Sequence, residues 1–221
     1  MPPPAWEYPV MLKTRIRKSA GRTESSRRWL ERQANDPFVR KARELGLRSR
    51  AAFKIREIDA KFRLLKPGAR VVDIGAAPGG WSQYAADRKC RTVAVDILDM
   101  PSIPGVVFGR FDFAEPECAE FIRGGLGGAA DVVMSDIAPN ATGNPSVDHL
   151  RIMALVEQAF DFAVSVLAPG GAFVAKVRQG GTEGALLSRM KRLFASVRHF
   201  KPDSSRKESS ETYVVATGYR G

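Results

Sequence analysis

The second part of the sequence alternates short apolar runs with stretches of helical periodicity, and this alternation restricts the fold more than any other feature. The runs expected to form strands are RVVDI, TVAVDI, GVVFGRF, ADVVMSDI and AFVAKV. Helices are expected from about Ser82, over about 148–167 and over about 183–196. Short apolar strands separated by helices are typical of a parallel sheet that is covered on both faces.

The end of the chain departs from this pattern. VRHFKP and ETYVVATGY have the composition of two strands, and the polar loop between them, DSSRKESS, is too short to hold a helix. Two strands this close in sequence pair antiparallel. The sequence therefore predicts an α/β fold with a mostly parallel seven-stranded sheet, an antiparallel last strand and helices on both faces.

The first 70 residues are organised differently. Residues 1–23 contain three consecutive prolines and no apolar period, so they are expected to form a disordered basic tail. Three helices are expected next, beginning near Ser25 or Ser26, at Asp36 with Pro37 in the first turn, and near Ser49. We predict one domain, residues 24–221, in which a basic helical segment (24–66) precedes the sheet core (67–221).

Positive charge is concentrated at the start of the chain. Residues 1–70 hold 19 Lys and Arg against 7 Asp and Glu, whereas residues 71–221 hold 16 against 17, within a net charge of +11. A basic segment attached to a neutral domain favours contact with a polyanion, most simply a nucleic acid. The alternative is a solvated basic tail that has no partner.

The cysteines and histidines indicate no metal chemistry. Cys90 and Cys118 match neither a redox pair nor a zinc motif and are interpreted as reduced packing residues. His149 and His199 are isolated from carboxylates and thiols, so we expect no metal. The first residues lack the features of a secretory signal or transit peptide, and we expect a cytoplasmic monomer.

A glycine-rich loop follows the first predicted strand. The strand ends in Asp73 and Gly75, and AAPGG leads from there into a helix. In doubly wound sheets such a loop lets a cofactor approach the backbone at the carboxyl ends of the strands. After Gly75 the next glycines are Gly79 and Gly80, which is not the dinucleotide spacing and makes a dehydrogenase less favoured. A tight structural turn is the alternative.

Two carboxylates narrow the choice of cofactor. Asp96 ends the second strand, where it can accept hydrogen bonds from both hydroxyls of a ribose. Asp112 follows the third strand, where it could receive the exocyclic amine of an adenine. Ribose and adenine without an obvious phosphate site indicate S-adenosylmethionine. The antiparallel last strand agrees, because by fold analogy it is characteristic of Rossmann-like methyltransferases.

Five segments resemble a known family. They are LRSRAAFKIREID, LLKPGARVVDIGAAPGGWSQY, VVMSDIAPNATGNPSVD, LAPGGAFVAKVRQG and KPDSSRKESSETYVVATG. They are similar to the FtsJ/RrmJ family of ribosomal RNA 2′-O-ribose methyltransferases, whose bacterial members modify a uridine of the large-subunit (23S) RNA. The resemblance implies a catalytic set carried here by Lys54, Asp136, Lys176 and Glu211. With the glycine loop, it implies cofactor contacts at Gly75, Gly79, Gly80, Trp81, Asp96, Asp112 and Asp136.

The chemistry suits these residue types, although each has a simpler alternative. Lys176 lies within an otherwise apolar strand, and a buried lysine needs a partner, which Asp136 on the next strand can provide. We hypothesise that Lys176 deprotonates or steers the 2′-hydroxyl, that Asp136 fixes Lys176 and the cofactor, and that Lys54 and Glu211 position the ribose. Alternatively, both lysines are solvated, Asp136 caps a turn and Glu211 pairs with Arg206.

A ribose hydroxyl as acceptor implies an RNA substrate, and the basic helices would hold its phosphates. The candidate residues for this contact are Arg27, Arg28, Arg32, Arg40, Lys41, Arg48 and Arg50. The expected partner is ribosomal RNA or the large ribosomal subunit. The alternatives are a methyltransferase of another RNA, such as transfer RNA or an mRNA cap, and a ribosome-assembly factor without catalysis.

Overall fold

The computed structural model describes residues 27, 30–31, 33–139, 142–178, 184–206 and 209–221. The expected tail, residues 1–23, and the expected helix start at Ser25 or Ser26 lie outside these residues. The proposed division of the chain into a tail and one domain therefore stays a prediction.

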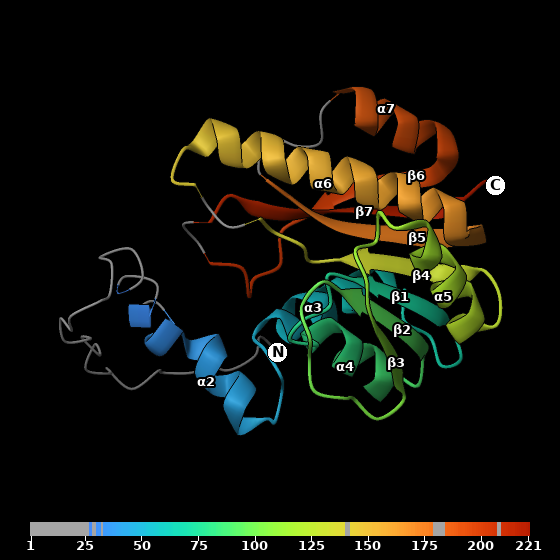
Figure 1. Ribbon diagram of the computed structural model, residues 1–221. Coiled ribbons are helices and arrows are strands. Elements are labelled where there is room, and N and C mark those ends of the chain that lie inside the picture. The colour runs from blue at the N-terminus through green and yellow to red at the C-terminus, as the bar shows by residue number, and fades with distance from the viewer. Residues whose placement is uncertain (1–26, 28–29, 32, 140–141, 179–183, 207–208) are drawn as a thin grey trace, which may run out of the picture.

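One sheet of seven strands forms the centre of the molecule (Figure 1). The strands are β1 (Arg70–Ile74), β2 (Arg91–Asp96), β3 (Val106–Arg110), β4 (Ala130–Ser135), β5 (Leu167–Arg178), β6 (Phe194–Phe200) and β7 (Glu211–Tyr219). Their order is β3-β2-β1-β4-β5-β7-β6. The first five strands run parallel, and β7 pairs antiparallel with both β5 and β6. The predicted seven-stranded sheet with an antiparallel last strand is confirmed.

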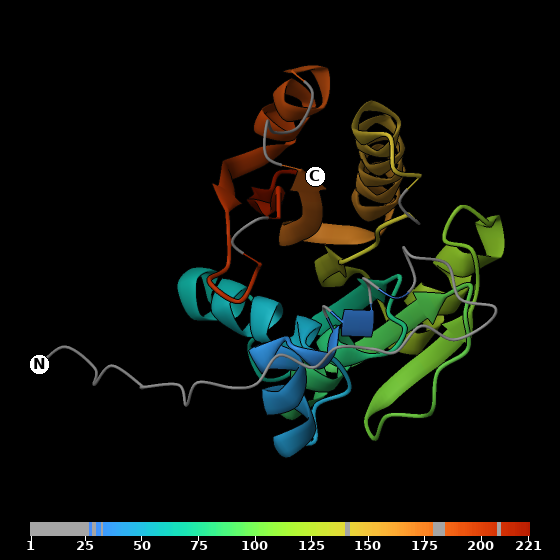
Figure 2. The same cartoon turned by 90° about the vertical axis from the view of Figure 1, so that its left-hand side faces the viewer.

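Helices cover both faces of this sheet (Figures 1 and 2). They are α2 (Pro37–Glu44), α3 (Ala51–Phe62), α4 (Gly80–Asp87), α5 (Pro116–Leu126), α6 (Pro145–Val166) and α7 (Gly184–Leu193). Side chains of α5, α6 and α7 form one apolar core with one face of the sheet, in which Phe160 and Phe173 are fully buried. Side chains of α3 and α4 form a second core with the other face, around Ile55 and Trp81.

The sequence pattern missed one helix. We expected no element between β3 and β4, but α5 fills this connection. Its sequence contains Gly124 and Gly125, and glycine is a poor helix former, so the helical signal is weak. Burial of Cys118, Ile122 and Leu126 in the core compensates for this weakness.

The helix α2 begins where capping chemistry predicts. Asp36 caps α2, because its Oδ1 accepts a hydrogen bond from the amide of Phe38 at 3.0 Å, and Pro37 lies in the first turn. The helix ends just before Gly46, which has the positive φ of 66° that glycine tolerates. The helix expected near Ser49 is α3, which begins two residues later at Ala51 and has no side-chain cap.

Some expected features of the chain can be checked directly. Cys90 and Cys118 are buried and unbridged, and burial raises the pKa of both thiols to about 11. None of the helices in the described residues combines the length and apolar character that crossing a bilayer requires. The same residues contain no group of three or more His, Cys, Asp or Glu side chains that could hold a metal ion.

Candidate active site

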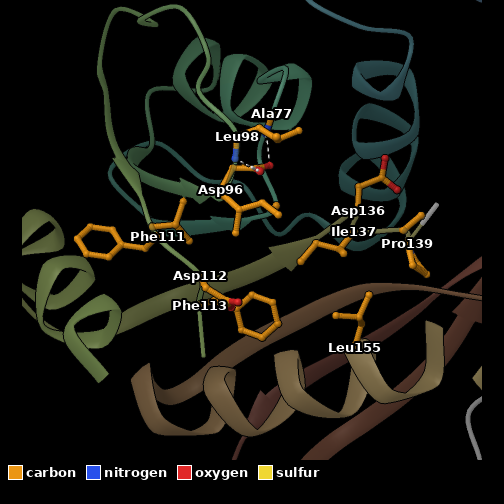
Figure 3. A pocket seen from close by; sticks show the side chains of 14 residues that line it. Ala77, Asp96, Leu98, Phe111, Asp112, Phe113, Asp136, Ile137, Pro139 and Leu155 are labelled. Carbon is orange, nitrogen blue, oxygen red and sulfur yellow. Dashed lines mark hydrogen bonds between the residues drawn. The ribbon is translucent and has the colours of Figure 1, made fainter. Parts of the chain in front are cut away.

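A cavity of about 550 Å³ opens at the edge of the sheet where the parallel strands end (Figure 3). Its walls come from the segments that follow β1, β2, β3 and β4, and Leu155 of α6 closes one side. Three of the predicted carboxylates, Asp96, Asp112 and Asp136, line it together with Gly75. Parallel strands bring their carboxyl ends to one edge, which is why residues so far apart in sequence meet here.

The backbone holds the Asp96 carboxylate in a fixed orientation. Its Oδ2 accepts a hydrogen bond from the amide of Ala77, and its Oδ1 accepts one from the amide of Leu98, both at 2.8 Å (Figure 3). Each oxygen keeps a second acceptor site. Asp112 lies across the cavity on an exposed position and accepts from the amide of Ala114 at 3.0 Å.

Apolar side chains surround these two carboxylates. Ile97 and Leu98 are 60% and 63% exposed, although both are large and apolar. Phe111 and Phe113 complete the lining on the β3 side. The cavity therefore combines apolar walls with a few fixed polar groups, which is the usual character of a site for a small organic ligand.

The glycines of the loop are required by packing within the protein. Gly75 has a φ of 72°, and a Cβ on it would lie 2.0 Å from Cγ1 of Ile137. A Cβ on Gly80 would lie 2.2 Å from the hydroxyl oxygen of Ser49. Because these glycines have no side chain, the segment after β4 and the residues just before α3 can pack closely against the loop, independently of any ligand.

Three predicted cofactor contacts lie beside the cavity and not in its lining. Gly79, Gly80 and Trp81 are absent from the residues that line it. Trp81 is 2% exposed, its Nε1 donates to the carbonyl of Ala51 at 2.9 Å, and its ring lies 5.6 Å from that of Tyr213. Their assignment to cofactor binding stays a prediction.

The four residues of the predicted catalytic set come together. Lys176 of β5 donates to the carboxylate of Asp136 at 3.0 Å and to its carbonyl at 2.6 Å. Lys54 of α3 lies 2.6 Å from Glu211, at the start of β7, and 3.9 Å from Asp136. The expected contact of Lys176 with Asp136 across neighbouring strands is confirmed. Glu211 contacts Lys54 and not Arg206.

Asp136 is the centre of this cluster. Burial raises its pKa, but Lys176, Lys54 and a hydrogen bond from Tyr213 outweigh burial and bring the pKa below its ordinary value of 3.8. Its carboxylate is therefore charged at neutral pH. Because Asp136 also lines the cavity, the charged cluster and the cavity are one continuous site.

Sequence reasoning missed Tyr213. Its hydroxyl lies 2.7 Å from Oδ1 of Asp136 and 3.1 Å from Oε1 of Glu211, so its single proton bridges two carboxylates. Burial and these two negative charges raise the pKa of Tyr213 well above 10, and the hydroxyl remains a donor. Only its position two residues after Glu211 on a strand, which places both side chains on one face, could have signalled it.

The loop between β6 and β7 is fixed to the N-terminal helices. Arg50 and Arg206 both contact the carboxylate of Asp36, and Arg50 also donates to the carbonyl of Ser204. Ser205, next in this loop, donates to Oε1 of Glu211 at 3.1 Å. The cluster of Asp36, Arg50 and Arg206 therefore connects α2 with the catalytic set.

The predicted RNA-contacting residues fall into three groups. Arg28 and Arg32 lie outside the described residues, while Arg27, Arg40 and Lys41 are described and interact within the protein. Arg48 donates to the carbonyls of Pro78 and Ser102, and Arg50 is held by Asp36 and Ser204. The guanidinium groups of Arg48 and Arg50 thus bond to other parts of the protein, so fewer of their N–H donors are available for RNA phosphates. Contact of these seven residues with RNA stays a prediction.

The family model for FtsJ-like methyltransferases matches residues 47–219 of this chain. The chain belongs to this family. The match spans β1 to β7 as well as α3, and it contains the cavity and all four residues of the charged cluster. The Rossmann-like methyltransferase fold and the family resemblance of the sequence are both confirmed.

Relatives that carry curated names support the same family assignment. The chain is 56% identical over 216 residues to the ribosomal RNA large subunit methyltransferase E of Xanthobacter autotrophicus, covering 95% of this chain and 85% of the relative. It is 54% identical over 216 residues to the protein of the same name from Azorhizobium caulinodans, covering 95% and 90%. A crystal structure of a ribosomal RNA methyltransferase from Plasmodium falciparum superimposes with a TM-score of 0.71 at 28% identity, covering 79% of this chain and 99% of that one.

Proposed function

We propose that this FtsJ-family enzyme transfers a methyl group from S-adenosylmethionine to the 2′-hydroxyl of a uridine in large-subunit (23S) ribosomal RNA, acting on the ribosomal subunit in the cytoplasm. The proposal rests on Asp136, because this residue belongs both to the lining of the cavity and to the charged cluster, where it pairs with Lys176 and Lys54. A ligand in the cavity would thus meet the groups that can orient and deprotonate a hydroxyl. The names of the relatives support ribosomal RNA as the substrate.

The cavity suits S-adenosylmethionine. Asp96 has fixed oxygens for the ribose hydroxyls, Asp112 lies where it can accept from an adenine amine, and Ile97 and Leu98 offer apolar surface to the base. Asp136 provides negative charge for the cationic end of the cofactor. Bound there, S-adenosylmethionine would supply a methyl group on a positively charged sulfur, which is a good leaving group.

The chain itself must hold the acceptor hydroxyl and remove its proton. Lys54 and Glu211 form one polar wall of the site, 2.6 Å apart, and are suited to hold the acceptor ribose. We assign the proton to Nζ of Lys176, which reaches Asp136 from the neighbouring strand. The cationic amine first releases one proton to solvent, and the neutral Nζ then takes the proton of the 2′-hydroxyl as the oxygen–methyl bond forms and the sulfur–methyl bond breaks. Asp136 and Tyr213 fix the direction in which Lys176 points.

A labelling experiment tests the proposal. The purified protein is incubated with methyl-labelled S-adenosylmethionine and large subunits from a strain that lacks its own enzyme, and the nucleosides are analysed by mass spectrometry. We expect 2′-O-methyluridine with the wild type and with the control variant Lys191→Ala, on the exposed side of α7, and none with Lys176→Ala. Labelling of transfer RNA or mRNA alone would overturn the ribosomal substrate. Absence of cofactor binding would favour an assembly factor without catalysis.

A further inference from the structure

A second hollow lies between α3 and α4, away from the cavity. It has a volume of about 480 Å³, and its charged rim consists of Arg56, Arg63, Lys66 and Arg88. The chain segments after α3 and after α4 meet beneath it, because the amide of Gly68 donates to the carbonyl of Lys89 at 2.8 Å. The sequence analysis named none of these cations as RNA contacts.

The only carboxylate in the lining of this hollow, Asp59, already has partners within the protein. One of its oxygens accepts from the amide of Leu65 at 2.8 Å, and the other accepts from the hydroxyl of Tyr84 at 3.1 Å. Arg88 pairs with it at 3.4 Å. Burial, with the charge of Asp59, raises the pKa of Tyr84 to about 12, so this hydroxyl stays a donor at neutral pH.

The other three cations remain available. Within the described part of the chain, the side chains of Arg56, Arg63 and Lys66 are exposed and make no hydrogen bond or ion pair. Arg56 lies on α3 and Arg63 directly follows its last residue, and the lining of the hollow brings the two side chains together. This contrasts with Arg48 and Arg50, whose side chains are bonded to other parts of the protein.

We infer that Arg56, Arg63 and Lys66 bind phosphates of the RNA backbone outside the nucleotide that is methylated. This inference rests on the proposed function, which supplies the RNA. Three unpaired cations beside a neutralised Asp59 form a surface that complements a polyanion. Lys54 precedes Arg56 by two positions and therefore points to the other side of α3, so the surface acts on RNA affinity and not on the reaction.

The test compares two triple variants of equal charge. Arg56→Gln, Arg63→Gln and Lys66→Gln remove the proposed contacts and leave Arg88 with Asp59. The matched control, Lys191→Gln, Arg192→Gln and Arg198→Gln, removes three exposed cations from α7 and β6. Binding of deproteinised large-subunit RNA is measured over a series of salt concentrations, together with cofactor affinity and turnover at saturating subunits.

We expect the first triple variant to bind RNA about tenfold more weakly. The slope of log affinity against log salt should fall in magnitude by about 2 to 3, because each of the three phosphate contacts contributes roughly 0.7 to 0.9. Turnover at saturation and cofactor affinity should match the wild type. RNA affinity and slope equal to those of the control would overturn the inference while the proposed function stands. A wild type that binds no RNA would overturn both.

Discussion

Among the described residues, the carboxylates of Asp136 and Asp36 each lie between two cations, yet only Asp136 belongs to the proposed active site. Asp136 lies between Lys54 and Lys176, and Asp36 lies between Arg50 and Arg206. The two clusters are neighbours, since Ser204 contacts Arg50 and Ser205 contacts Glu211. Each cluster has one carboxylate between two cations, but we assign a catalytic role to the Asp136 cluster and a structural role to the Asp36 cluster.

The cations and their access explain the difference. Arginine keeps its proton in proteins and presents a rigid fork, so the Asp36 cluster can only fix the geometry of the chain. Lysine carries a compact amine that can exchange its proton, and Asp136 lines the cavity whereas Asp36 does not. A partly buried ion pair therefore becomes a candidate for catalysis when a ligand can reach it and when its cation is able to exchange a proton.

Replacing a lysine of the Asp136 cluster with arginine, the cation of the Asp36 cluster, should have the largest effect on the single-turnover rate. Lys176→Arg keeps the positive charge beside Asp136 but removes the proton acceptor, as Lys176→Ala also does. We expect both variants to lose about 10²- to 10⁴-fold in single-turnover rate, the usual contribution of a general base. Cofactor affinity, measured by calorimetry, serves as the control. A rate near that of the wild type in Lys176→Arg would show that charge alone suffices.

Removing the charge at the centre of the second cluster should lower stability. Asp36→Asn keeps an N-cap for α2 but leaves Arg50 and Arg206 without a counter-charge, so we expect a loss of about 3 kcal/mol in the free energy of unfolding. The measurement is denaturant unfolding. The control is Asp99→Asn, which removes an exposed pair with Arg110 and should cost about 0–1 kcal/mol. Equal losses would contradict the structural role of Asp36.

Asp73 of β1 is a fully buried carboxylate whose hydrogen-bond partner is a neutral side chain. The hydroxyl of Ser82 donates to it at 2.5 Å, but burial outweighs this bond and raises its pKa from 3.8 to about 7. Between these two values the folded state holds a proton that the unfolded state has lost, so stability falls as pH rises and levels off above about pH 7.

Asp73→Asn tests this reasoning, because it removes the titration and keeps an acceptor for Ser82. From pH 5 to pH 8 the wild type should lose about 2 to 3 kcal/mol more unfolding free energy than the variant. Thermal or urea unfolding at both pH values measures the difference. Parallel changes in the two proteins would exclude a raised pKa at Asp73.

The smallest expected effect lies at the junction of the two clusters. Ser205→Ala removes one hydrogen bond to Glu211, which is worth about 0.5 to 1.5 kcal/mol. We expect turnover to fall about two- to tenfold and the free energy of unfolding to fall by no more than this amount. The exposed Ser165→Ala is the control. Unchanged turnover would show that Lys54 and Tyr213 hold Glu211 without help from the loop.

Local signals in the sequence predicted most of the fold. The apolar runs of β1 to β5 and the short link between β6 and β7 predicted the sheet, and Asp36 with Pro37 predicted the start of α2. The α5 helix was missed because Gly124 and Gly125 weaken its helical pattern, and only its packing in the core compensates for them. The residues of the charged cluster came from family resemblance, since no local pattern joins Lys54 to Glu211.

The sequence by itself determined the α/β sheet and the basic character of the first helices, because both depend on the order and type of neighbouring residues. Only the tertiary structure decided which charges meet. It pairs Asp36 with Arg206 and places the Tyr213 hydroxyl between two carboxylates. Among the residues that the structure describes, it gives the side chains of Arg56 and Arg63 no hydrogen bond or ion pair. Such contacts join positions that are far apart along the chain, and their distances are set by the order of the strands and by the packing of helices on the sheet.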